Sequence, residues 1–245
     1  MNPAAPAVHL RYGEGMISTL LLASAIAVAV PPAAPGASPP AKAAASDGFV
    51  SLFNGKDLTG WTGARGQPPQ GYAVEDGAIV CLADGRNLYT SKEYGDFSLR
   101  FRFQLTPGAN NGIGVRTPNE GDAAYEGLEI QVLDNTAERW AGLKPWQFHG
   151  SVYGIAAATR RDALKPIGEW NEEEIEVRGR RVKVTLNGTV LVDVDLDEAT
   201  KGGTQSGQPH PGLKRSAGYI CFCGHGDRVA YKDLEVREFP RSTVR

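Results

Sequence analysis

Residues 97–105 read FSLRFRFQL, a stretch in which apolar side chains at the odd positions alternate with polar side chains at the even positions. Alternation with a period of two is typical of a β-strand that buries one face. Residues 182–194, VKVTLNGTVLVDV, place Asn187 and Gly188 between two further runs of this kind, which is a strong hairpin signal. Residues 128–133, LEIQVL, alternate in the same way. These stretches predict half-buried antiparallel strands.

The same pattern extends over most of the chain. Further strands are predicted at residues 170–178, 218–223 and 228–239, whereas helical periodicity is confined to short stretches at 136–142 and 197–200. The chain has 30 glycines and 16 prolines, which favour many turns and few long helices. We therefore expect an all-β protein, an antiparallel β-sandwich in which two sheets pack face to face.

The first 45 residues differ from the rest. Residues 16–30, MISTLLLASAIAVAV, are apolar, and a Pro/Ala-rich stretch, PPAAPGASPPAKAAA, follows at 31–45. The apolar run is shorter than the roughly 20 residues of a membrane-spanning helix, so no stable membrane span is expected. Residues 1–45 are predicted to be a signal peptide and linker, cleaved near 43–45, with an uncleaved anchor as the alternative. We expect an exported protein, periplasmic or extracellular, with residues 46–245 as one domain.

Composition excludes several classes of function. The 245 residues carry a formal net charge of -2, so no strongly basic field is present to bind nucleic acid. The three cysteines, Cys81, Cys221 and Cys223, form no C-x-x-C pair, which argues against zinc-ribbon and thioredoxin-like proteins. They are predicted to be small buried hydrophobes, although one of the last two could instead bridge to Cys81.

One polar string lies on a strand otherwise suited to burial. Glu129 and Gln131 share a strand face, and Asp134 follows at the strand end. A conventional glycosidase needs two carboxylates that flank one sugar bond. Glu129 and Asp134 could provide them only if a bulge brings them to one face, because their spacing is odd. The alternative is a polar stripe that faces solvent.

The segment NNGIGVR at residues 110–116 leaves one strand face open at Gly112 and Gly114. By simple alternation Arg116 lies on that face, where a ligand could approach backbone and guanidinium together. The alternative is a tight strand crossing with a surface arginine.

Few histidines can carry a proton near neutral pH. His225 lies between two glycines in a predicted turn, which suits an exposed general base, and His149 lies at a loop-to-strand entry. Either could instead bind a divalent metal together with Glu129. His210, between two prolines, is the weakest candidate.

Four aromatic residues lie near loops and strand ends, where their rings could stack on a sugar: Tyr125, Trp140, Trp146 and Tyr153. Burial in the core is an equally good explanation for each of them.

The residues GFVSLFNGKDLTGW at 48–61 resemble the opening of the 3-keto-disaccharide hydrolase domain family. The resemblance continues in the family's order through DFSLRFRF, NNGIGVRTP, GLEIQVLDN, HGSVYG, GEWNEEEIEVRG, LNGTVLVD and GHGDRVAYKDLEV. It implies a jelly-roll sandwich of the concanavalin A-like lectin/glucanase type. It also implies cleavage of 3-keto-glycosides or 3-keto-disaccharides by C2 deprotonation, β-elimination and hydration.

By matching segments, Glu129 and Gln131 fall on the family's Glu-x-Gln strand, Arg116 on its Asn-x-Gly-Ile-x-x-Arg segment and His225 on its C-terminal His-Gly turn. We expect catalytic roles for these residues other than Gln131, with His149 as an alternative to His225. Arg116 would clamp an oxyanion or hydroxyl, Glu129 would be an acid/base or a metal ligand, and His225 or His149 would carry the proton. Gln131 and Asn111 join the four aromatic residues as expected substrate-binding residues. Where the family often reads Gly-Leu-Gln before its His-Gly turn, this chain has Cys221-Phe222-Cys223-Gly224.

Two other functions fit the same fold. A non-catalytic carbohydrate-binding module would keep the aromatic residues and Arg116 but would need no titrating base. A conventional glycosidase would use Glu129 and Asp134 on unoxidised glycosides.

Overall fold

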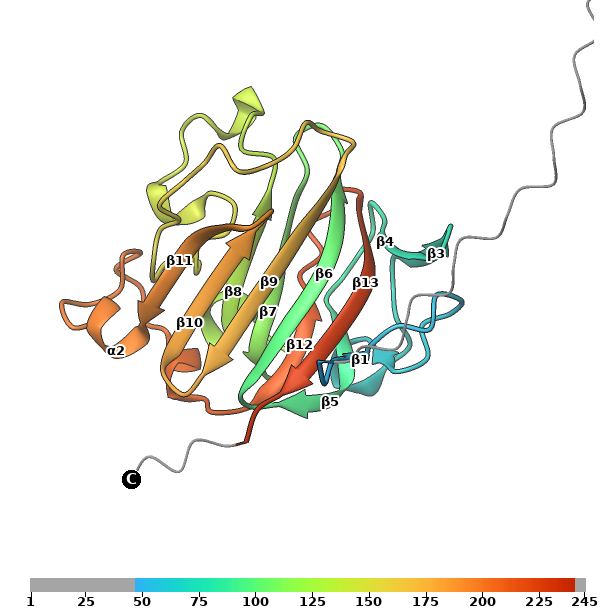
Figure 1. The fold of residues 1–245 in the computed structure, drawn as a ribbon, viewed down its shortest axis with the longest axis horizontal. Helices are drawn as coiled ribbons and strands as arrows, with labels where there is room; N and C mark the ends of the chain where they lie inside the picture. The colour runs from blue at the N-terminus through green and yellow to red at the C-terminus, as the bar shows by residue number, and fades with distance from the viewer. Residues whose placement is uncertain (1–46, 241–245) are drawn as a thin grey trace, which may run out of the picture. The chain divides into compact units, whose positions relative to one another are not determined.

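The computed structural model describes residues 47–240, which form a sandwich of two antiparallel β-sheets (Figure 1). The predicted fold class is confirmed, because strands account for nearly all of the regular structure in this part of the chain. The predicted signal peptide and linker at residues 1–45 lie outside the described residues.

One sheet has eight strands in the order β11-β10-β9-β6-β13-β4-β3, with β1 paired to β13. Its long central strands all follow the alternation of the sequence, so that one face packs inward and the other faces solvent. The strands of this sheet are β1 (Val50–Ser51), β3 (Tyr72–Glu75), β4 (Ala78–Cys81), β6 (Phe97–Leu105), β9 (Trp170–Arg178), β10 (Arg181–Leu186), β11 (Thr189–Asp195) and β13 (Val229–Glu238).

The other sheet has five strands in the order β2-β5-β12-β7-β8. They are β2 (Trp61–Thr62), β5 (Leu88–Tyr94), β12 (Gly218–Phe222), β7 (Asn110–Thr117) and β8 (Leu128–Leu133). In Figure 1 this sheet lies behind the strands β9, β6 and β13 of the larger sheet. The helical segments are short: α1 (Ala123–Glu126), α2 (Leu196–Ala199), η1 (Ala64–Gly66), η2 (Glu138–Trp140), η3 (Pro145–Gln147) and η4 (Pro211–Lys214).

The predicted hairpin is present where the sequence indicates it. Strands β10 and β11 pair antiparallel, and the turn between them has φ of 48° at Asn187 and 81° at Gly188. Positive φ at both central residues matches the right-handed twist of the flanking strands, which explains why Asn-Gly is favoured here.

The core fills the space between the two sheets and contains aromatic residues from both. Phe222 of β12 stacks on Tyr231 of β13 with ring centroids 4.2 Å apart, and Trp61 of β2 stacks on the same phenylalanine at 5.0 Å. These rings join the sheets at the point where the chain passes from one to the other.

The three cysteines are buried and form no disulfide. This confirms the prediction that they pack as small hydrophobes, and it excludes a bridge to Cys81 in this structure.

Within residues 47–240, no helix has the length and apolar character that crossing a membrane requires.

Phe222→Ala tests the central role of this aromatic stack. Removing a fully buried phenylalanine costs about 3–5 kcal/mol of unfolding free energy, because it loses burial and leaves a cavity. Urea denaturation of the variant should therefore show a large drop in stability. Val190→Ala is the control, because its side chain is 43 % exposed and its loss should cost less than about 0.5 kcal/mol. Equal stability of the two variants would contradict this description of the core.

Candidate active site

Strands β7 and β8 carry the candidate site on the outer face of the five-stranded sheet. Along β8, Leu128, Ile130 and Val132 belong to the core, whereas Glu129 and Gln131 line a cavity on the opposite face. The sequence prediction that these two polar residues share a face is therefore met. They face a cavity and are only 4 % exposed, so they are not a solvent-facing polar stripe.

Gly112 makes room for the carboxylate of Glu129. In the register of β7 and β8, Gly112 lies opposite Gln131 and Gly114 opposite Glu129. A β-carbon at Gly112 would lie 2.6 Å from Cδ of Glu129 and 2.7 Å from its Cγ, closer than real β-carbons approach other atoms. The Glu129 side chain thus lies across the backbone of β7, in a trough that exists because Gly112 has no side chain.

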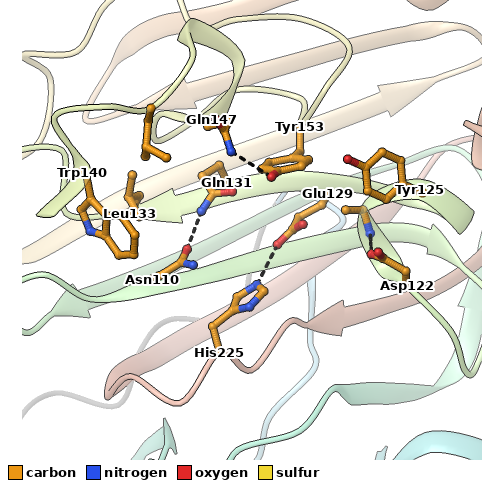
Figure 2. Close-up of a pocket in the computed structure, with 12 residues that line it drawn as sticks. Asn110, Asp122, Tyr125, Glu129, Gln131, Leu133, Trp140, Gln147, Tyr153 and His225 are labelled. Carbon is orange, nitrogen blue, oxygen red and sulfur yellow. Dashed lines mark hydrogen bonds and ion pairs between the residues drawn. The ribbon is translucent and has the colours of Figure 1, made fainter. Parts of the chain in front are cut away.

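The carboxylate at the end of this trough meets His225. This histidine lies in the turn between β12 and β13, and its Nε2 is 3.5 Å from Oε1 of Glu129. Figure 2 shows the two side chains pointing toward each other. The hydrogen bond to Glu129 raises the pKa of His225 above its ordinary value, although partial burial opposes the shift. The imidazole side chain stays 43 % exposed while the carboxylate side chain is 5 % exposed, so the histidine is the part of the pair that a ligand meets.

The cavity around the pair has a volume of about 240 Å³. Figure 2 shows Trp140 and Leu133 at one end and Tyr125 at the other. Its lining residues are Asn110, Asp122, Ala124, Tyr125, Glu129, Gln131, Leu133, Trp140, Leu143, Gln147, Tyr153 and His225.

Hydrogen bonds fix the polar groups that line this cavity. Gln131 donates from Nε2 to Oδ1 of Asn110, which orients the amide nitrogen of Asn110 away from that bond. Gln147 donates from Nε2 to the hydroxyl oxygen of Tyr153 at 3.0 Å, so the tyrosine keeps its own proton for another acceptor. Asn110 and Tyr153 are therefore hydrogen-bond donors held in fixed positions.

Three of the four predicted aromatic residues line the cavity, and the fourth supports one of them. Tyr125 and Tyr153 meet edge to face at 6.2 Å, and Trp146 packs edge to face on Tyr153 at 4.9 Å from outside the lining set. Trp140 is held by a hydrogen bond from its Nε1 to the carbonyl of Gly108. His210, the weakest histidine candidate, is buried behind the pocket wall, with its ring 4.7 Å from that of Tyr125.

Arg116 does not face this cavity. Its backbone has φ of 52°, in the left-handed region, which breaks the simple alternation that placed it beside Gly112 and Gly114. Its side chain is 2 % exposed and pairs with Asp96 at 2.8 Å. The expectation that Arg116 clamps a substrate oxygen next to Glu129 is therefore not met by the geometry.

His149 also lies away from the cavity, in the interior between the sheets. Its Nδ1 accepts a hydrogen bond from the Leu133 amide, its Nε2 lies 3.0 Å from Glu173, and its ring stacks on Phe103 at 5.2 Å. His149 thus lies with Glu173 in the interior, whereas Glu129 lies on the outer face, and the two do not meet at a common metal position. No group of three or more His, Cys, Asp or Glu within residues 47–240 is arranged to hold a metal ion. The residues present do not fit the divalent-metal site that the sequence suggested.

Two further expected residues have structural roles instead. Asp134 accepts hydrogen bonds from the Gly108 amide and from Thr136, and these lower its pKa even though burial opposes the shift. It is not among the cavity residues, so Glu129 and Asp134 do not form a carboxylate pair. Asn111 points to the core side, where its side-chain oxygen accepts a hydrogen bond from the Tyr231 hydroxyl at 2.8 Å.

The sequence reasoning missed Asn110, Asp122 and Gln147. Asn110 could have been found from the alternation of the strand. Asn110 shares the outer face with Gly112, whereas Asn111 points to the core. Asp122 caps helix α1 by accepting a hydrogen bond from the Ala124 amide, and Gln147 belongs to a short 3₁₀ turn. Neither residue lies in a periodic stretch of sequence that would show where its side chain points.

Comparison with known proteins agrees with this architecture. Residues 48–237 match the model of a family described as the 3-keto-alpha-glucoside-1,2-lyase-like domain. The 3-keto-disaccharide hydrolase of Bacteroides thetaiotaomicron is 26 % identical over 230 residues, which cover 78 % of this chain and 79 % of that protein.

Solved structures show the same fold. A candidate glycosyl hydrolase from Parabacteroides distasonis superposes with a TM-score of 0.69 at 28 % identity, over 79 % of this chain and 94 % of that one. A Bacillus subtilis protein with a galectin-like fold superposes with a TM-score of 0.52 at 13 % identity, over 79 % of this chain and 96 % of that one.

The match spans nearly the whole described sandwich, and the chain belongs to the 3-keto-alpha-glucoside-1,2-lyase-like domain family. The resemblance inferred from the ordered motifs is thereby confirmed, and so is the expectation of an enzyme of the glycoside-cleaving class.

Gly112→Ala tests whether the trough sets the Glu129–His225 contact. A β-carbon at this position displaces the carboxylate, so the raised pKa of His225 should fall toward or below its ordinary value of about 6.5. NMR titration of the histidine ring measures this change. The protonated imidazole that the carboxylate stabilises would then be lost at a lower pH than in the parent protein.

Gly142→Ala is the matched control, because nothing lies within 4 Å of its added β-carbon. It should leave the titration of His225 unchanged. An unchanged midpoint in Gly112→Ala would show that the glycine does not position Glu129.

Proposed function

We propose that this protein is a hydrolase that cleaves 3-keto-glycosides, including 3-keto-disaccharides, through elimination followed by hydration. The observation that carries the proposal is the Glu129–His225 pair, which faces a cavity lined by aromatic residues on the outer face of the sandwich. The names of the family and of the Bacteroides relative support the substrate class.

The chemistry begins with the acidity of the sugar. A ketone at C3 acidifies the C2 proton, because the resulting carbanion is delocalised as an enolate. When Nε2 of His225 donates to Glu129, Nδ1 holds the lone pair that accepts this proton. Glu129 orients the imidazole and stabilises the positive charge that it acquires. A buried carboxylate next to an exposed imidazole suits this division of roles.

The enolate then collapses with loss of the C1 substituent. The C3 carbonyl re-forms, a C1–C2 double bond is made and the C1–O bond breaks, with a proton delivered to the departing oxygen. Water next adds across the double bond, giving oxygen to C1 and a proton to C2. Asn110 and Tyr153 supply hydrogen-bond donors for the enolate oxygen or the leaving group.

The site suits this route better than ordinary glycoside hydrolysis. An ordinary glycosidase needs one carboxylic acid and one free carboxylate on either side of the sugar bond. Here Asp134 is engaged in a turn, and Asp122, the other carboxylate that lines the cavity, caps α1. A carboxylate with an imidazole matches proton abstraction next to a carbonyl instead.

A matched substrate pair tests the proposal. Purified protein is incubated with a disaccharide and with its 3-keto form, and release of free sugar is followed. Only the 3-keto form should be cleaved, and His225→Gln should lower the rate by about 10²–10⁴-fold, the usual contribution of a general base. His210→Gln is the control, because His210 does not line the cavity.

Other outcomes lead to other functions. Cleavage of the plain disaccharide would favour a conventional glycosidase. Binding of both sugars without cleavage of either would favour a carbohydrate-binding module.

We also propose that the protein is exported, on the basis of the leader-like residues 16–45. The mass of the protein recovered from the periplasm or medium should then correspond to a chain that begins near residue 46. A full-length protein that stays in the cytoplasm would contradict this.

A further inference from the structure

A second cavity lies where three turns meet the end of β7. It is lined by Gly95, Asp96, Arg116, Gly179, Arg180, Lys214, Arg215 and Ser216, and its volume is about 370 Å³. None of these residues lines the cavity around Glu129 and His225. The second cavity is therefore a separate feature, and it accounts for the arginine that the proposed reaction does not use.

Arg116 forms the buried wall of this cavity. Its guanidinium donates to the carbonyl of Gly95 at 3.2 Å, to the carbonyl of Gly179 at 2.8 Å and to Oδ1 of Asp96 at 2.8 Å. Gly95 and Asp96 belong to the turn between β5 and β6, and Gly179 belongs to the turn between β9 and β10. These contacts fix the guanidinium and use three of its five N–H groups.

Arg215 belongs to the third turn, which lies between η4 and β12, and its side chain is held against Arg116. Its Nε donates to the carbonyl of Arg116 at 2.8 Å, a bond that leaves the four N–H groups of its terminal nitrogens for other acceptors. Lys214 precedes it at an exposed position. Among the described residues, no ion pair is formed by the side chain of either residue.

Positive charge predominates in this cavity. Four cationic side chains line it, whereas the lining contains one carboxylate, Asp96, and Asp197 pairs with Arg180 from outside at 2.8 Å. Burial, and then the charge of Arg180, lower the pKa of Arg116 in spite of the nearby carboxylate. Cations that gather in a partly enclosed space attract an anion more strongly than the same charges spread over an open surface.

We propose that this cavity binds an oxyanion, either a free sulfate or phosphate ion or the charged group of an acidic saccharide. Guanidinium groups match carboxylate, sulfate and phosphate oxygens with two parallel hydrogen bonds, and two arginines here are oriented by backbone carbonyls before any ligand arrives. The volume exceeds that of one tetrahedral ion, so the anion can be carried by a larger molecule. The site is independent of the proposed glycoside cleavage.

A purely structural role explains less of this arrangement. The β5–β6 and β9–β10 turns are already joined by the backbone contacts of Arg116 and by the hydrogen bond from the Gly179 amide to Asp96. Neither Lys214 nor the terminal nitrogens of Arg215 are needed for that joint, yet both line the same cavity.

Isothermal titration of the full chain tests the proposal. Sodium sulfate, sodium phosphate and sodium glucuronate are titrated at constant ionic strength, which is kept with sodium chloride. We expect saturable binding of at least one of these anions with one site per chain. Binding of the inorganic ions indicates a free oxyanion as ligand, and binding of glucuronate alone indicates an acidic saccharide.

Variants assign the binding to this cavity. Lys214→Glu and Arg215→Gln should each weaken the affinity at least tenfold, whereas Lys56→Glu, an exposed lysine outside the cavity, should bind as the parent does. Cleavage of the 3-keto substrate should be unchanged in Lys214→Glu. Arg116 is left intact, because its loss would remove the joint between the turns.

Two results would overturn the proposal. One is the absence of saturable binding above the chloride background. The other is an equal loss of affinity in Lys56→Glu and Lys214→Glu, which would indicate a general effect of net charge.

Discussion

A β-carbon at Gly112 would overlap the side chain of Glu129, and the arrangement of the whole site follows from the absence of that atom. The bare backbone of β7 lets the carboxylate lie across the sheet, where it reaches a histidine from a turn that passes between the two sheets. The carboxylate and its partner therefore come from distant parts of the chain. Their contact depends on the register of β7 and β8, which holds Gly112 opposite Gln131.

The two faces of the five-stranded sheet use polar residues in opposite ways. On the outer face, Glu129 is paired with a histidine that remains open to a ligand. Beneath the inner face, Glu173 of β9 in the larger sheet and His149 form a pair with nearly no exposed surface, where a charge without a partner would be costly. The composition of the two pairs is the same. Access to the imidazole is what makes one pair suitable for proton transfer and the other a structural contact of the interior.

Most of the fold could be predicted from the sequence, because the alternation in residues 97–105 and the Asn-Gly turn at 187–188 are local signals that the sandwich keeps. Glu129, Gln131 and His225 could be placed at the site for the same reason. Arg116 could not, because its left-handed backbone shifts the alternation by one residue. His149 could not either, because it lies in a turn that is followed only by an isolated bridge at Val152, and a turn has no period that shows where a side chain points. The alternation of β7 predicts Asn110 on the cavity face, and the expectation that Asn111 lies there was wrong, because Asn111 is one residue out of step with Gly112.

The burial of the three thiols has a consequence for their reactivity. Cys81, Cys221 and Cys223 are at most 3 % exposed, and the sulfurs of Cys221, in β12, and Cys223, just past its end, are 3.7 Å apart. A disulfide requires about 2.05 Å between sulfurs, so closing one there would distort the ladder that β12 forms with β5 and β7. Residues 47–240 are therefore held together without a covalent cross-link. The packing around the three thiols also shields them from oxidants and alkylating reagents in the solvent.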